Sequence, residues 1–162
     1  MYARIVKLFS AVSLAFGLAL TSAAFAQSKY DDEGVIKVKS AYPLDETIIR
    51  LKKDIAAKGI RFFQEIDQQK LAAEAGIKVR PSTLLVFGNP PLGTQFLAAN
   101  PLAGLDWPVR LLVQQDENGD VWAAYTDFIW IARRHQIKET DQQPFKTASG
   151  VIASIASSVT AK

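Results

Sequence analysis

The chain contains no cysteine at any of its 162 positions. This excludes disulfide bonds, thiol catalysis, cysteine-ligated zinc, iron–sulfur clusters, covalent haem attachment through a Cys-x-x-Cys-His motif and a lipoprotein anchor. No covalent cross-link therefore stabilises the fold. The length gives room for one ordinary core, since domains usually have about 100–150 residues.

The first 26 residues have the pattern of a signal peptide. Arg4 and Lys7 precede the apolar segment Leu8–Leu20, and small residues follow as far as Ala26. This is a charged region, an apolar region and a cleavage site of the Ala-x-Ala type. The apolar segment is shorter than the roughly 20 residues that a membrane-spanning helix needs. We therefore expect export by a Sec-type route to the periplasm, with cleavage after Ala26.

The cleaved chain would consist of a flexible N-terminus at 27–34 and a single domain at 35–162. Loss of the first 26 residues removes the only methionine and lowers the basic residues from 19 to 17, against 16 acidic residues. A net charge near +1 excludes the basic surface of a nucleic-acid-binding protein. The lack of Cys and Met argues against a copper carrier. We expect no metal, no cofactor, no nucleic acid and no stable membrane anchor, whereas a homo-oligomer remains possible.

Local patterns predict a strand at 35–39, near a sheet edge, followed by an amphipathic helix. Pro43 begins this helix, Gly59 ends it, and the apolar residues recur at helical spacing. Further strands are predicted at 60–66, 83–87, 109–115 and 121–126. In the strand at 60–66, Ile60, Phe62 and Ile66 are expected on one face. The last two strands form a hairpin around Asn118-Gly119.

Other segments allow more than one interpretation. The continuous apolar run at 83–87 predicts a central strand buried on both faces. Residues 88–108 are rich in proline and glycine, and form either a functional loop or a covering layer with a short helix at 94–99. Short helices are expected at 67–75 and after Asp127, which can N-cap the second of them. A final helix begins at Pro144, with Ser149 on its outward face.

This order of elements predicts an α+β fold, with a mostly antiparallel sheet and helices packed on one face. Written as a string, the order is β-α-β-β-β-β-α-like. The pattern contains no internal repeat.

Short motifs along residues 35–160 form a recognisable set. They are Gly59-Ile60, Phe63, Ile66-Asp67, the segment Arg80–Pro90, Gly93-Thr94, Asp106, Pro108, Tyr125, Asp127 and Arg134-His135. In these residues the chain resembles the bacterial and archaeal family known as domain of unknown function 302. The resemblance implies an architecture similar to that of the TATA-box-binding protein, but fold alone does not imply DNA binding. Many relatives have His where this chain has Gln68.

A set of polar residues would converge if segment 88–108 folded across the sheet. They are Asn89, Thr94, Asp106, Arg110 and Tyr125. In one interpretation they orient a ligand in an apolar pocket, lined by Phe62, Phe87, Phe96, Trp107 and Trp122. In the other, Asn89 and Thr94 satisfy backbone groups in turns, Asp106 pairs with Arg110, and the aromatic residues belong to the core.

Catalytic candidates are few. Asp67, Asp106 and His135 are weak candidates for acid–base chemistry, because an imidazole titrates near neutrality. His135 also follows Arg133 and Arg134 at a predicted helix end, where cations interact favourably with the helix dipole. The sequence Asp116–Asp120 resembles the start of a calcium loop, but Val121 stands where such a loop requires glycine, so the hairpin is favoured.

These observations favour an exported protein that binds a small, largely apolar molecule or a protein partner without catalysis. The alternative is a cofactor-independent enzyme that uses Asp106, Arg110, Tyr125 and His135. A second alternative is a self-associating module with a dry, symmetric interface over the sheet.

The leader makes the first testable prediction. Protein purified from the cell envelope should have an intact mass that corresponds to a chain beginning at Gln27, because the Ala-x-Ala site is the expected cleavage point. A mature chain that retains Met1 would contradict this assignment.

Overall fold

In the computed structural model of the chain, which describes residues 34–161, five strands form one antiparallel sheet. They are β1 (Val35–Lys39), β2 (Arg61–Asp67), β3 (Ser82–Gly88), β4 (Val109–Gln115) and β5 (Val121–Thr126). Their order across the sheet is β1-β5-β4-β3-β2, and every neighbouring pair is antiparallel. The α+β class and the edge position of β1 are thereby confirmed.

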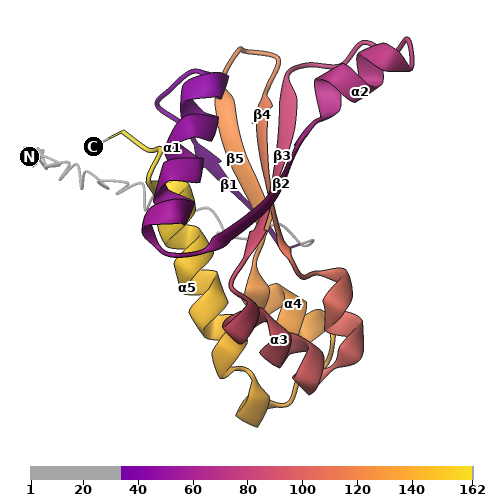
Figure 1. Cartoon of the computed structure of the whole chain (residues 1–162), viewed down its shortest axis with the longest axis vertical. Helices are drawn as coiled ribbons and strands as arrows, with labels where there is room; N and C mark the ends of the chain where they lie inside the picture. The colour runs from indigo at the N-terminus through magenta and orange to yellow at the C-terminus, as the bar shows by residue number, and fades with distance from the viewer. Residues whose placement is uncertain (1–33, 162) are drawn as a thin grey trace, which may run out of the picture.

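The helices divide between one face and the two ends of the sheet (Figure 1). Helices α1 (Leu44–Ala57) and α5 (Gln143–Ser157) cover one face. At one end lie α3 (Pro90–Ala99), the 3₁₀ helix η1 (Pro101–Leu105) and α4 (Phe128–Arg134), and a short turn η2 (Glu139–Asp141) leads into α5. Helix α2 (Gln68–Glu74) projects at the opposite end and has no buried residue. A functional site could therefore form at either end of the sheet or on its open face.

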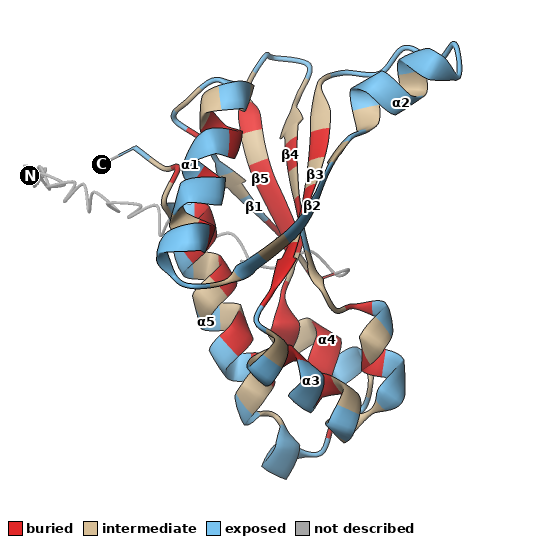
Figure 2. Ribbon diagram, in the orientation of Figure 1, coloured by how far each residue is buried: buried red, intermediate tan, exposed pale blue. Residues whose placement is uncertain are grey.

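The core lies between the sheet and α1 and α5, and continues into the layer of α3 and α4 (Figure 2). In α1 the predicted stripe is confirmed, since Ile48, Leu51 and Ile55 are buried. Gly59 follows the helix with a φ of 65°, a left-handed conformation that glycine adopts without strain.

A β-bulge in β2 changes which of its residues share a face. Phe62 pairs with Phe87 and the next pair is Gln64 with Val86, so Phe63 is the extra residue. Beyond the bulge Ile66 pairs with Leu84, on the open face. The prediction that Phe62 and Ile66 share a face was therefore wrong, because one inserted residue reverses the alternation.

Strand β3 is not buried on both faces. Leu85 and Phe87 are in the core, whereas Leu84 and Val86 are only half-buried. The strand has neighbours on both sides, but the middle position of the sheet belongs to β4. The apolar run overpredicted burial, because helices cover only one face.

Segment 88–108 forms a covering layer, and its helix begins earlier than the sequence pattern suggested. Helix α3 starts at Pro90, with both prolines in its first turn, where the missing backbone N–H groups have no helical acceptor in any case. The Phe96 ring stacks on Phe145 at 4.4 Å between centroids and lies 5.1 Å from Phe128. These three rings join α3, α4 and α5.

The structure also bears on two predictions about the N-terminal residues and the start of α4. The predicted signal peptide at 1–26 and residues 27–33 of the predicted flexible N-terminus lie outside the described residues. Gly34 is buried against Trp130 and its carbonyl accepts a hydrogen bond from Asp127 N at 2.9 Å. Asp127 occupies the N-cap position as expected, but its buried carboxylate accepts a hydrogen bond from the Ser149 hydroxyl instead of capping the helix. Ser149 therefore points inward, contrary to prediction.

The β4–β5 hairpin is confirmed and is organised by Asp116. Its Oδ1 accepts from the backbone N–H groups of Asn118 and Asp120, both at 2.9 Å, and its Oδ2 accepts from Trp122 Nε1 at 2.8 Å. The Trp122 hydrogen bond, followed by those from Asp120 and Asn118 and the charge of Lys39, lowers the pKa of Asp116 from its ordinary value.

This lowered pKa predicts how the hairpin responds to acid. A carboxyl with a lower pKa in the folded state stabilises the fold above its unfolded pKa, near about 4, and loses that contribution as pH falls through the folded pKa. The variant Asp116→Asn should be less stable than the wild type at pH 7, and the difference should shrink toward zero near pH 2. Urea denaturation across this pH range measures both. A difference that is constant with pH would contradict the assignment.

Candidate functional site

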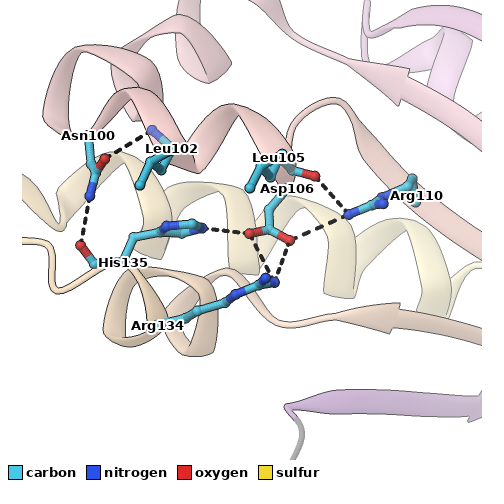
Figure 3. A network of polar contacts seen from close by, with 7 residues as sticks. All are labelled: Asn100, Leu102, Leu105, Asp106, Arg110, Arg134 and His135. Atoms are coloured by element: carbon cyan, nitrogen blue, oxygen red, sulfur yellow. Dashed lines mark hydrogen bonds and ion pairs between the residues drawn. The ribbon is translucent and has the colours of Figure 1, made fainter.

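The carboxylate of Asp106 collects three positively charged or polar donors beside β4 (Figure 3). Asp106 ends η1 and is 7% exposed. Its Oδ2 lies 2.6 Å from His135 Nε2, and Arg134 Nη1 donates to both oxygens, at 3.1 and 3.3 Å. Arg110 Nη2 donates to Oδ1 at 3.4 Å and to the Leu105 carbonyl at 3.0 Å. We call these four residues the Asp106 cluster.

Backbone contacts hold the cluster in place. Asn100, at the N-cap of η1, accepts from Leu102 N at 2.9 Å and donates to the His135 carbonyl at 3.0 Å. His135 ends α4, and the following residue, Gln136, has a φ of 51° that turns the chain away. Both ends of η1 are thus joined to the end of α4, the start through the His135 carbonyl and the end through the buried carboxylate of Asp106.

The cluster has two chemical features. An imidazole with one nitrogen on a carboxylate has a fixed orientation, which is the arrangement used in acid–base pairs. The two arginines carry permanent charge and are about half exposed, at 54% for Arg110 and 47% for Arg134. The Arg134 guanidinium also lies over the Trp130 ring, with Cζ 5.8 Å from the ring centroid.

A separate apolar pocket lies between the end of the sheet and helices α3 and α5. Its empty space, counted to the open solvent, is about 360 Å³, but its free room is about 30 Å³, enough for one or two water molecules. The residues around it are Ile60, Phe87, Gly88, Asn89, Leu92, Gly93, Phe96, Trp107, Val109, Phe128, Ala148, Val151 and Ile152. Its walls are therefore almost wholly apolar.

The indole of Trp107 forms part of the wall of this pocket. It lies so close to Gly93 that a Cβ added there would overlap the ring, and a Cβ at Gly88 would lie 3.1 Å from Nε1. The Phe63 ring also contacts it, nearly perpendicular to the indole, at 6.4 Å between centroids. The absence of side chains at Gly88 and Gly93 therefore leaves the space that the indole occupies.

The structure brings together only part of the predicted ligand-binding set. Asp106 and Arg110 pair, as the structural interpretation expected. Asn89 lines the apolar pocket instead, and Thr94 is exposed and donates to the Pro90 carbonyl within α3. Tyr125 is 4% exposed on the core face of β5. The five residues therefore do not converge on one site.

Other candidates separate in the same way. Asp67 caps α2 by accepting from Lys70 N at 2.9 Å, at the end of the sheet opposite the Asp106 cluster. Of the expected aromatic residues, Phe87, Phe96 and Trp107 line the apolar pocket, whereas Phe62 and Trp122 do not. His135 lies at the C-cap of α4, after Arg133 and Arg134, where the helix-dipole interpretation places it, and its Nε2 also contacts Asp106.

Sequence reasoning missed Arg134 and Asn100 as members of the site. Both contacts join residues about 30 positions apart, namely Arg134 with Asp106 and Asn100 with His135. The one available signal was the pairing of Arg134 and His135 in the family-like motifs.

Residues 34–161 contain neither a cluster of metal ligands nor a membrane-spanning helix. No group of three or more metal-ligating side chains is present among them. None of the helices formed by these residues is long and apolar enough to cross a membrane.

Asp106 yields a stability prediction. Asp106→Asn keeps the size of the side chain but leaves Arg134 and His135 without their buried counter-charge. It should lower the free energy of unfolding by about 2–4 kcal/mol. Glu46→Gln, which breaks an exposed ion pair with Arg50, is the control and should cost less than about 0.5 kcal/mol. Equal losses in urea denaturation at pH 7 would contradict the assignment.

The fold of this chain has a counterpart among solved structures. A crystal structure of an uncharacterized conserved protein DUF302 from Bacillus stearothermophilus superposes with a TM-score of 0.72 at 19% identity, over 78% of this chain and 98% of that one. This likeness shows the fold.

Among curated relatives are proteins named fluoride-specific ion channel FluC 1 from Brucella suis and Brucella abortus. Each is 36% identical over 106 residues, which is 65% of this chain. The match covers 42% and 39% of their lengths, so the chain spans about two fifths of these relatives. Residues 36–155 match the family described as Domain of unknown function DUF302, and the protein belongs to that family.

Proposed function

We propose that this protein binds a small, largely apolar molecule in the pocket under Trp107 and does not transform it. The observation that carries the proposal is the pocket itself, which has apolar walls contributed by the sheet end, α3, α4 and α5. Small-molecule sites are mostly apolar and contain few polar groups. Asn89 at the rim is such a group.

The closed state leaves too little room for a ligand larger than water, so binding requires the Trp107 indole to move. The indole is half-buried and lies on two glycines. Because Gly88 and Gly93 have no side chains, the indole can move without a change of side-chain conformation at these two positions. The signal-like leader supports the further proposal that binding takes place in the periplasm.

Native mass spectrometry of protein purified gently from the cell envelope tests this proposal. Extra mass that is lost on denaturation is expected in the wild type. Val151→Phe fills the pocket from α5 and should abolish the extra mass, whereas Leu102→Phe, at a residue 64% exposed on η1, should retain it. A bare subunit mass in the wild type, or equal retention in both variants, would contradict the proposal.

A glycine substitution tests the role of Trp107. Gly93→Ala should displace the indole, shift its Nε1 resonance in NMR spectra and lower the free energy of unfolding by about 1–3 kcal/mol, as overpacking does. In Gly150→Ala, on α5, the new Cβ meets nothing within 4 Å, so this control should gain about 0.5–1 kcal/mol. A stabilised Gly93→Ala protein with an unshifted resonance would contradict this packing.

A second candidate function is cofactor-independent acid–base catalysis at the Asp106 cluster. The observation that favours it is the 2.6 Å contact between His135 and Asp106 in a nearly buried setting. Within residues 34–161, however, the side-chain hydrogen bonds of His135 are limited to Asp106. An activity that His135→Gln abolishes, with folding intact, would favour this candidate over binding.

Self-association is a third candidate. The open face of the sheet carries a row of cross-strand apolar neighbours, Ile66, Leu84, Leu112 and Ala124. The same native mass spectra report the number of subunits. A dimer that Leu112→Glu converts to monomer, with no small molecule bound, would favour this function.

A further inference from the structure

The Asp106 cluster carries more positive than negative charge. Its single carboxylate faces two guanidinium groups that are always charged, together with the His135 imidazole. Within residues 34–161, neither Arg110 nor Arg134 forms an ion pair with any acid other than Asp106. At least one positive charge is therefore left without a counter-charge.

Each arginine keeps donors that Asp106 does not use. Both arginines contact the same oxygen, Oδ1 of Asp106, which Arg110 approaches from β4 and Arg134 from the end of α4 (Figure 3). Arg110 uses Nη2 for its protein contacts and Arg134 uses Nη1. In the described part of the chain, Nε and the second terminal nitrogen of each have no protein acceptor. These are the groups that grip carboxylate and phosphate oxygens in pairs.

A small recess adjoins Arg110. It is lined by Asp106, Val109, Arg110, Thr126, Phe128 and Ile131, and has an empty space of about 240 Å³ counted to the open solvent but a free room of only about 20 Å³. This is room for about one water molecule, so the substituent of a bound anion would lie outside the recess. Asp106 itself repels anions, but its negative charge is balanced by the three donors that contact it.

We propose that Arg110 and Arg134 bind the carboxylate or phosphate group of a small ligand, and that Asp106 is the positioning residue for both guanidinium groups. This site goes beyond the proposed apolar pocket and does not depend on it. Val109 and Phe128 line both spaces, whereas Arg110 lines only this recess.

The test is a titration of the full chain, as it accumulates in the cell, with sodium phosphate and separately with sodium acetate at constant ionic strength. The arginine Nε–Hε resonances report binding by NMR. The proposal expects saturable shifts at Arg110 and Arg134. The tighter of the two probes identifies the anionic group as phosphate or carboxylate.

Matched variants decide whether the site is specific. Arg110→Gln and Arg134→Gln should each weaken binding by about tenfold or more, as loss of a charge-assisted contact does. Arg133→Gln is the control, because Arg133 is the exposed neighbour of Arg134 on α4 and makes no contact with Asp106. Arg110→Lys keeps the charge without the paired donors, so it should also weaken binding while the protein stays folded.

Two outcomes would overturn the proposal. One is the absence of saturable shifts at Arg110 and Arg134 with either anion. The other is an equal loss of binding in Arg133→Gln, since this would show general attraction to positive charge. Neither outcome would affect the apolar pocket, whose ligand is detected by native mass and blocked by Val151→Phe.

Discussion

The buried carboxylate of Asp106 is the contact on which the lower end of the molecule depends. Three segments meet at it, namely the end of η1, the strand β4 through Arg110, and the end of α4 through Arg134 and His135. A buried charge is tolerated only when it is paired and hydrogen-bonded. Trp107 directly follows Asp106 in the chain. The residue that packs against Gly93 is thus the chain neighbour of the residue at the centre of the ion cluster.

The sheet and the helices around it determine where a site can form. Helices α1 and α5 fill one face with core residues, and the stack of Phe96, Phe128 and Phe145 fixes α3 against α5. The apolar pocket lies where this second layer meets the sheet end. The anion site proposed for Arg110 and Arg134 is on the solvent side of the same junction, so one small region carries both candidate functions.

Local signals predicted much of the fold. The stripe in α1, the Asn-Gly hairpin and the alternation in β1 are short-range patterns, and all three were correct. The bulge at Phe63 and the start of α3 at Pro90 were missed. A single inserted residue leaves no trace in hydrophobic alternation, and two prolines are compatible with either a break or a first helical turn.

The candidate site was less predictable than the fold. The pairing of Asp106 with Arg110 spans four residues and could be anticipated. The contacts of Asp106 with Arg134 and His135 depend on how η1 packs against α4. The position of the Trp107 indole depends on Gly88 and Gly93, which belong to two other elements. Residue types alone did not reveal that Tyr125 faces the core while Asn89 faces the pocket.

The central claim is that an apolar molecule enters beneath Trp107. The most direct measurement is an NMR experiment that detects nuclear Overhauser contacts between dissolved benzene, used as the probe, and the methyl groups of the protein. The account predicts contacts with the methyls of Leu92, Val151 and Ile152, together with a shift of the Trp107 indole resonance. Contacts confined to the exposed residues Leu102 and Leu105, with an unchanged indole, would contradict it.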